Sequence, residues 1–313
     1  MKCLRAVAVL ALTVTLASLP AAAQSVEDAS AQHDPVPTLH VDVRLVNVLI
    51  SVTDANGAPI DGLGQNDFAV EDNGQPQKIA LFERQTNRPL NLVLALDTSG
   101  SVGKDLDAER AAARRFAHSI LRPQDSMSLI EFATEVHPVV PFTSDVKRIE
   151  HGLNTLHRGA ATALYEAIQK AAQSLGTRDG RRVLVLVTDG GDTVDTVTYQ
   201  QALESALRAE VIVYSLIDVP IEASAGRDLG GEHALITLSG QTGGRYFYLD
   251  QIGADASFSK ISEELRTQYW IGYYPSRQNG AEDFHRITVK IPRAGGDAYQ
   301  LRYRSGYYSA NTR

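Results

Sequence analysis

Three separated segments of the chain carry side-chain oxygens that could bind a hard metal ion. Asp97, Ser99 and Ser101 stand in one Asp-Thr-Ser-Gly-Ser run, Thr162 lies in a second segment, and Asp189 begins an Asp-Gly-Gly-Asp run in a third. Two carboxylates and three hydroxyls, with no His or Cys among them, suit Mg²⁺, Mn²⁺ or Ca²⁺ and not zinc. These residue types therefore predict a site for a divalent cation, with Mg²⁺ as the first expectation.

The elements that must position these residues can be predicted from the hydrophobic pattern. Residues 92–96 form a continuous apolar run that ends at Asp97, residues 183–187 form another just before Asp189, and residues 211–217 form a third. Strands that are apolar on both faces belong in a parallel sheet covered by helices. Ligands of open α/β sheets bind outside the carboxyl ends of the strands, where both aspartates would lie.

The covering helices are also visible. Apolar side chains recur at helical spacing in residues 106–120 and again in residues 164–175. Thr162 stands just before the second of these helices, where it would act as the cap. Alternating strands and helices predict an α/β fold with a doubly wound, mostly parallel sheet over residues 88–268.

Both flanks of this domain have the pattern of β-strands. Residues 39–87 include the alternation Val46, Val48, Ile50 and Val52, and residues 269–313 include alternating apolar side chains and many tyrosines. Each segment is too short to bury a core alone. The two ends of an inserted domain lie close together, so we expect the N- and C-terminal β segments to form one β-sandwich.

The five oxygen-bearing residues, in this order and at these places, resemble the metal-ion-dependent adhesion site of von Willebrand factor type A domains. The resemblance covers residues 88–268 and leaves no motif position unmatched, so the site would be intact. The flanks, with Tyr269–Pro275 and Arg304–Tyr308, are similar to those of secreted bacterial proteins related to this family. The resemblance implies hydroxyl ligands from Ser99, Ser101 and Thr162, and direct or water-mediated binding by Asp97 and Asp189. One open coordination position would take a carboxylate from a protein partner.

Several alternatives to this interpretation stay open. Asp-x-Ser-x-Ser alone is also an ordinary strand-to-helix turn with Ser as a helix cap. Asp192 could support the ligands from outside the coordination sphere, or it could be a solvated loop carboxylate. A metal-dependent hydrolase or phosphatase on the same site is an alternative to a non-enzymatic module, although an aspartyl phosphatase usually has a second Asp where this chain has Ser99. An accessory subunit of a larger envelope complex is a further alternative.

The first residues predict export. Lys2 and Arg5 precede an apolar run and a small-residue cleavage site, so residues 1–23 resemble a secretory signal peptide and residues 24–38 a disordered leader. The single cysteine, Cys3, would leave with the signal. We expect a periplasmic or extracellular protein whose mature chain has no membrane span. The net charge of −7 argues against a nucleic-acid binder with a broad basic surface.

Overall fold

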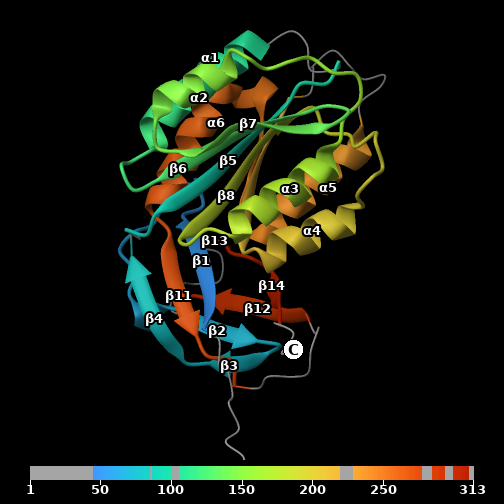
Figure 1. Ribbon diagram of the computed structural model, residues 1–313. Helices are drawn as coiled ribbons and strands as arrows, with labels where there is room; N and C mark the ends of the chain where they lie inside the picture. Colours follow the sequence, from blue (N-terminus) through green and yellow to red (C-terminus); the bar gives the residue numbers. More distant parts are fainter. Residues whose placement is uncertain are drawn as a thin grey trace, which may run out of the picture. The chain divides into compact units, whose positions relative to one another are not determined.

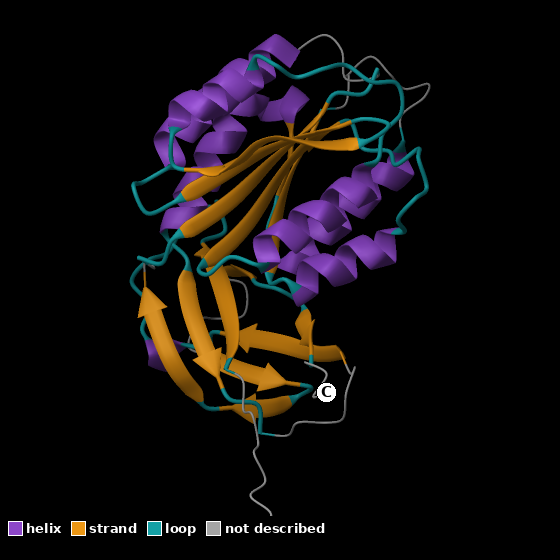
Figure 2. Cartoon of the chain, in the orientation of Figure 1, coloured by secondary structure: helices purple, strands orange, loops and turns teal. Residues whose placement is uncertain are grey.

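The computed structural model describes residues 45–84, 87–100, 106–218, 228–276, 284–292 and 299–309, all of them within one compact unit. They form a helix-covered sheet and a pair of smaller sheets (Figures 1 and 2). The expected signal peptide and leader, and Ser101, lie outside the described residues. Among the helices that are described, none is long and apolar enough to cross a membrane.

The large sheet has six strands in the order β10-β9-β8-β5-β6-β7. All neighbours are parallel except β6 and β7, so the prediction of a mostly parallel sheet is confirmed. Every residue of the central strand β5 is buried, which explains why its sequence is a continuous apolar run. The strands are β5 (Leu90–Asp97), β6 (Ser126–Phe132), β7 (Val136–Thr143), β8 (Arg181–Thr188), β9 (Val211–Ile217) and β10 (Tyr246–Tyr248).

Helices cover both faces of this sheet, as Figure 1 shows. One face packs against α1 (Leu106–Ile120), α2 (Val146–Leu153) and α6 (Leu249–Arg266). The other face packs against α3 (Leu164–Gly176), α4 (Tyr199–Arg208) and α5 (Leu229–Thr242). Successive β5 side chains enter the two cores alternately, because neighbouring residues of a strand point to opposite faces.

The two flanking segments form a β-sandwich of two four-stranded sheets, ordered β13-β1-β11-β4 and β14-β12-β2-β3. Each sheet takes two strands from either segment, so the predicted pairing of the flanks is confirmed. The N-terminal segment supplies β1 (Val46–Thr53), the short 3-10 helix η1 (Gln65–Asp67), β2 (Ala69–Asp72), β3 (Gln75–Gln77) and β4 (Ile79–Arg84). The C-terminal segment supplies β11 (Tyr269–Tyr273), β12 (Phe284–Lys290), β13 (Gln300–Arg302) and β14 (Gly306–Tyr308).

The sandwich has one core that both segments share. The alternating side chains of β1 are at most 5% exposed and pack with Tyr269, Ile271 and Tyr273 of β11 and Ile287 and Val289 of β12. Burying a side chain of this size stabilises the fold by about 1.5–3 kcal/mol. Because β1 pairs antiparallel with β11, most of this stabilisation depends on strands more than 200 positions apart in the sequence.

Candidate metal site

Asp97 and Asp189 leave the sheet at the same edge. Asp97 is the last residue of β5, and Asp189 directly follows β8, the parallel neighbour of β5. Asp97 is only 1% exposed, whereas Asp189 is half-buried. The structure therefore brings together the two carboxylates that the strand pattern placed at the carboxyl edge.

The carboxylate of Asp97 is held by uncharged donors. The amide of Ser99 donates to Oδ1 at 2.8 Å, and the hydroxyl of Thr188 donates to Oδ2 at 2.7 Å. Burial raises the pKa of Asp97 to about 6, and the charge of Asp189 adds to the rise, while these hydrogen bonds oppose it. Within the described part of the chain, no Lys or Arg forms an ion pair with Asp97. A cation at this edge would relieve the cost of burying its charge.

The segment with Thr162 is fastened to the segment with Asp97. The amide of Gly159 donates to the carbonyl oxygen of Thr98 at 2.9 Å. A Cβ atom on Gly100 would lie 3.6 Å from the carbonyl oxygen of Gly159, so the two loops are in contact. Thr162 is 4% exposed and lies three residues after Gly159 in the same loop, so the segment that carries it is joined to the loop that follows β5.

The loop after β8 is fastened to Thr162 in turn. The amide of Thr162 donates to the hydroxyl of Thr193, and the amide of Thr193 donates to the carbonyl oxygen of Thr162, both at 2.8 Å. The loop also packs against the start of α5, because a Cβ atom on Gly231 would lie 2.0 Å from the carbonyl oxygen of Gly190. All three segments predicted to carry ligands thus meet at one edge of the sheet.

The expectation that Thr162 caps the following helix is wrong. The N-cap of α3 is Ala163, whose side chain makes no capping hydrogen bond. Asp192 binds the first turn of α3 instead, because its Oδ1 accepts from the amide of Tyr165 at 3.0 Å. Its Oδ2 accepts from the amide of Asp195, also at 3.0 Å. Asp192 therefore joins the β8 loop to the first turn of α3, and the Thr162 hydroxyl has no capping role.

The donor set fits a hard cation. No cluster of three or more His, Cys, Asp or Glu side chains suited to a metal occurs among the described residues, so a cation here depends on hydroxyl oxygens and water beside the two carboxylates. Mg²⁺ is commonly bound in this way, by one or two carboxylates and several retained waters. Asp97, Ser99, Thr162 and Asp189 are described and lie on the converging segments, whereas Ser101 lies outside the described residues.

Sequence reasoning missed two residues that shape this edge, Thr188 and Thr193. Thr188 is fully buried and binds Asp97, and Thr193 fixes the backbone of Thr162. Thr188 stands at the end of the same apolar run as Asp189, and that position was the signal that could have revealed it. Thr193 lies in a loop, where the sequence has no pattern that distinguishes a threonine with a structural contact from one without.

A cleft of about 210 Å³ adjoins the same edge. It is lined by Thr98 and by a group of polar side chains that includes Glu131, His137, His157 and Arg158. The carboxylate of Glu131 accepts from the backbone amide of His157 at 2.8 Å, which holds the histidine beside the cleft. The lining of this cleft therefore combines acidic, basic and imidazole side chains.

Residues 92–191 match the family model of the von Willebrand factor type A domain. Among solved structures, the chain is similar to a von Willebrand factor type A protein from Catenulispora acidiphila, with 14% identity, 77% of this chain and 75% of that chain covered, and a TM-score of 0.50. It is also similar to an aerotolerance-related membrane protein from Bacteroides fragilis NCTC 9343 (23% identity, 56% and 98% covered, TM-score 0.45). A third similar structure is the vWF domain of the type V pili tip protein Mfa5 from Porphyromonas gingivalis, with 13% identity, 57% of this chain and 95% of that chain covered, and a TM-score of 0.46.

The matched residues run from β5 to the loop after β8 and include Asp97, Thr162 and Asp189. The similarity to the Catenulispora acidiphila protein is a similarity of fold. The helix-covered part of this protein thus contains a segment, residues 92–191, that is similar to the von Willebrand factor type A domain.

Proposed function

We propose that this protein is an exported, non-enzymatic binding module that attaches to an acidic residue of a protein partner through a divalent cation. Asp97, Ser99, Thr162 and Asp189 would hold the cation, Mg²⁺ first, together with Ser101. When bound, the cation supplies a coordination position that a carboxylate oxygen from the partner can fill. The observation that carries the proposal is the buried carboxylate of Asp97, which accepts from the Ser99 amide and the Thr188 hydroxyl at the edge where all three ligand segments meet.

The balance of charge favours an acidic partner group. Two carboxylates would neutralise a divalent cation if both bound it directly, and the hydroxyls would add no charge. If one carboxylate binds through water, the cation keeps more of its positive character at the open position. A carboxylate is the hard anionic ligand that proteins most readily offer to such a cation. The proposed bond also offsets the repulsion between a chain of net charge −7 and an acidic partner surface.

We expect cation binding to weaken as the pH falls through the pKa of Asp97. Burial raises that pKa to about 6, so protons compete with the cation below this pH, whereas the carboxylate is ionised above it. The apparent Kd for Mg²⁺ should rise about tenfold per pH unit below pH 6 and level off above it. Calorimetric titrations between about pH 5 and pH 8 measure this dependence. An affinity that stays constant over that interval would contradict the role of Asp97.

The proposed function is tested by capturing the partner with the protein itself. Envelope extract from the source organism is passed over immobilised protein in Mg²⁺, eluted with a chelator and analysed by mass spectrometry. Thr162→Ala removes one proposed ligand and leaves both carboxylates in place. We expect it to lose the chelator-eluted partner while its thermal stability barely changes.

The control is Thr177→Ala, which removes an exposed threonine hydroxyl at the opposite end of α3. This variant should capture the partner as the wild type does. If Thr162→Ala captures its partner as well as the control, and chelator leaves that complex intact, cation bridging is not the way in which this protein binds.

A further inference from the structure

A second site candidate lies at the amino edge of the large sheet, opposite the candidate metal site. A cavity of about 300 Å³ opens where the starts of β8 and β9 and the residues before β5 meet the sandwich strands β1 and β11. The α/β domain and the sandwich both contribute to its walls. A molecule bound there would contact both parts of the chain.

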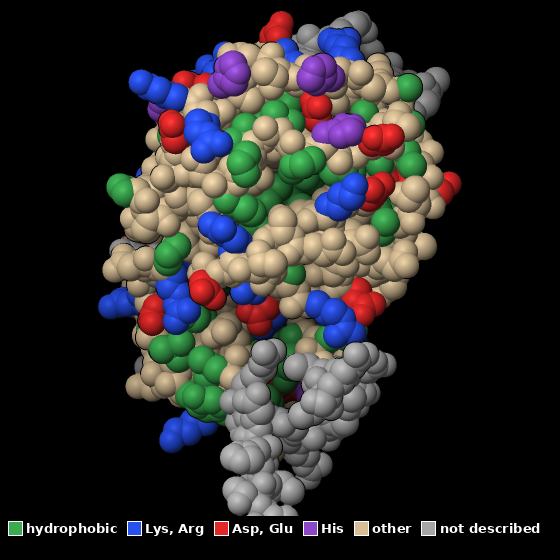
Figure 3. Space-filling view, viewed as in Figure 1, with side chains coloured by type: hydrophobic (Ala, Val, Ile, Leu, Met, Phe, Trp, Pro, Cys, Tyr) green, Lys and Arg blue, Asp and Glu red, His purple; other side chains and the backbone are tan. Residues whose placement is uncertain are grey.

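The cavity is rich in arginine. Four arginine side chains line it against two carboxylates, although the chain as a whole has a net charge of −7. On the face drawn in Figure 3, by contrast, Lys and Arg are interspersed with Asp and Glu. The lining arginines are Arg88, Arg181, Arg182 and Arg304, and the carboxylates are Asp179 and Glu210.

Two of these arginines are buried in spite of their charge. Arg304 and Arg181 are each 7% exposed, and a guanidinium keeps its charge in proteins. One nitrogen of Arg304, Nη2, donates to the carbonyl oxygen of Asn47 at 2.6 Å and to Glu210 at 3.1 Å. Within the described structure, Nε of both arginines and Nη1 of Arg304 have no hydrogen-bond acceptor. The cavity lining therefore holds more positive charge than its own two carboxylates neutralise.

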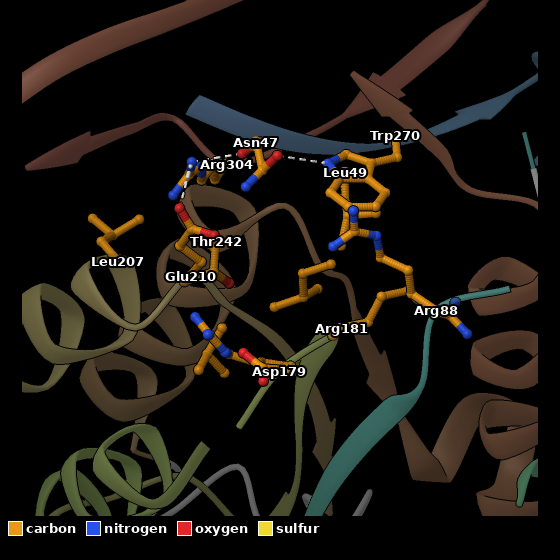
Figure 4. A pocket seen from close by; sticks show the side chains of 14 residues that line it. Asn47, Leu49, Arg88, Asp179, Arg181, Leu207, Glu210, Thr242, Trp270 and Arg304 are labelled. Atoms are coloured by element: carbon orange, nitrogen blue, oxygen red, sulfur yellow. Dashed lines mark hydrogen bonds and ion pairs between the residues drawn. The ribbon is translucent and has the colours of Figure 1, made fainter. Parts of the chain in front are cut away.

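On the other side of the cavity, the flat guanidinium of Arg88 covers the indole ring of Trp270. Trp270 is 4% exposed, and the guanidinium carbon of Arg88 lies 3.2 Å from the centroid of its ring. The indole nitrogen donates to the side-chain oxygen of Asn47 at 3.1 Å, which fixes the ring. Figure 4 shows Arg304 and the Arg88–Trp270 pair on opposite sides of the space, with Leu49 beside the indole. A flat ring bound here would stack on the exposed guanidinium of Arg88, while its anionic group faces the other arginines.

We infer that this cavity binds a small organic anion in which a carboxylate or phosphate group is attached to a flat apolar ring. The volume equals that of roughly ten water molecules, which admits one ring and its charged group. The arginines would supply charge-assisted hydrogen bonds to the oxyanion, and the stacked Arg88–Trp270 pair with its aliphatic neighbours would form the wall beside the ring. This inference does not depend on the metal site.

The chain provides its own reporter, because Trp270 is its single tryptophan. Purified protein is titrated with benzoate and with phenyl phosphate while tryptophan fluorescence is recorded, and calorimetry repeats each titration. We expect saturable binding of at least one of the two, with a Kd of about 1 mM or tighter. The comparison of the two anions shows which oxyanion the site prefers. Neutral benzamide and inorganic phosphate should bind at least tenfold more weakly, because benzamide lacks the anionic group and inorganic phosphate lacks the ring.

Two variants test the assigned residues. Arg304→Gln should weaken anion binding tenfold or more, and Arg88→Gln gives the same test at an exposed position that does not endanger folding. Arg286→Gln changes an exposed arginine of β12 outside the cavity and should bind like the wild type. The inference is overturned if neither anion binds saturably, if inorganic phosphate equals phenyl phosphate, or if Arg88→Gln and Arg304→Gln both keep wild-type affinity.

Discussion

Replacing Asp72 with alanine should lower the free energy of unfolding by about 3–5 kcal/mol, a large part of the stability of an ordinary domain. Asp72 ends β2 and is 5% exposed in the middle of the sandwich. Its Oδ2 accepts from the hydroxyls of Tyr273 at 3.0 Å and Tyr307 at 2.8 Å, and its Oδ1 lies 3.0 Å from Nδ1 of His285. Alanine would leave two buried groups, those of Tyr273 and His285, and the half-buried Tyr307 hydroxyl without this partner.

The magnitude follows from the cost of each orphaned group. A buried donor that loses its acceptor costs about 1–3 kcal/mol. Burial, reinforced by the charge of Asp72, raises the pKa of Tyr273 and of Tyr307, so both hydroxyls keep their protons and remain donors well above neutral pH. The carboxylate also connects β2 with β11, β12 and β14, so its loss weakens contacts between N- and C-terminal strands.

Urea unfolding measures the effect. Glu71→Ala is the matched control, because Glu71 adjoins Asp72 on β2 but pairs with the exposed Lys290, at 2.7 Å, and surface pairs contribute at most about 1 kcal/mol. Tyr307→Phe removes one donor and keeps the ring, so it should cost about 1 kcal/mol. If Asp72→Ala is no less stable than Glu71→Ala, the network contributes little to the fold.

The second large effect concerns Asp97. Wild-type protein should gain about 2.7 kcal/mol of stability in Mg²⁺ at a hundredfold excess over Kd, which corresponds to a rise in Tm of about 5–10 °C. Asp97→Asn should abolish this gain. Without cation, the variant should be more stable than the wild type at pH 7 by roughly 1–3 kcal/mol. Burial raises the pKa of Asp97 to about 6, so ionising this carboxyl costs more free energy in the folded state than in the unfolded state.

Asp195→Asn provides the control for charge alone. Asp195 is exposed in the same loop as Asp189, and asparagine tolerates its positive φ of 55°. This variant removes one negative charge near the edge and should keep the full response to Mg²⁺. Melting curves of the three proteins, with Mg²⁺ and with chelator, give the comparison. A wild-type response in Asp97→Asn would show that the cation binds elsewhere.

Much of the fold could be predicted because its signals are local. A strand buried on both faces must be apolar at every position, so β5, β8 and β9 are visible as continuous runs. A helix that covers a sheet must repeat its apolar side chains about every 3.6 residues, so α1 and α3 are visible too. The aspartates at the ends of β5 and β8 follow from the same pattern, because parallel strands finish at one edge.

The remaining features depend on distant contacts. Thr188 reaches Asp97 only because β8 pairs with β5 in one particular register. Asp192, and not Thr162, binds the start of α3 because the loop after β8 lies against the first turn of that helix. Neither contact has a local signature. A one-residue change of register would turn the side chains to the opposite faces, so these contacts can be decided only by the packed sheet.

The sequence by itself determined the fold class and was enough to predict a type of metal ligand, because strand burial and oxygen-bearing side chains are properties of short segments. Only the tertiary structure decided that Asp72, Tyr273, Tyr307 and His285 share one buried network, and that four arginines surround a cavity beside Trp270. The physical reason is the same for the Asp72 network and for the arginine-lined cavity. The residues come from segments up to 235 positions apart. They meet because the two flanking segments gain enough buried apolar surface by pairing to offset the entropy of closing so long a loop.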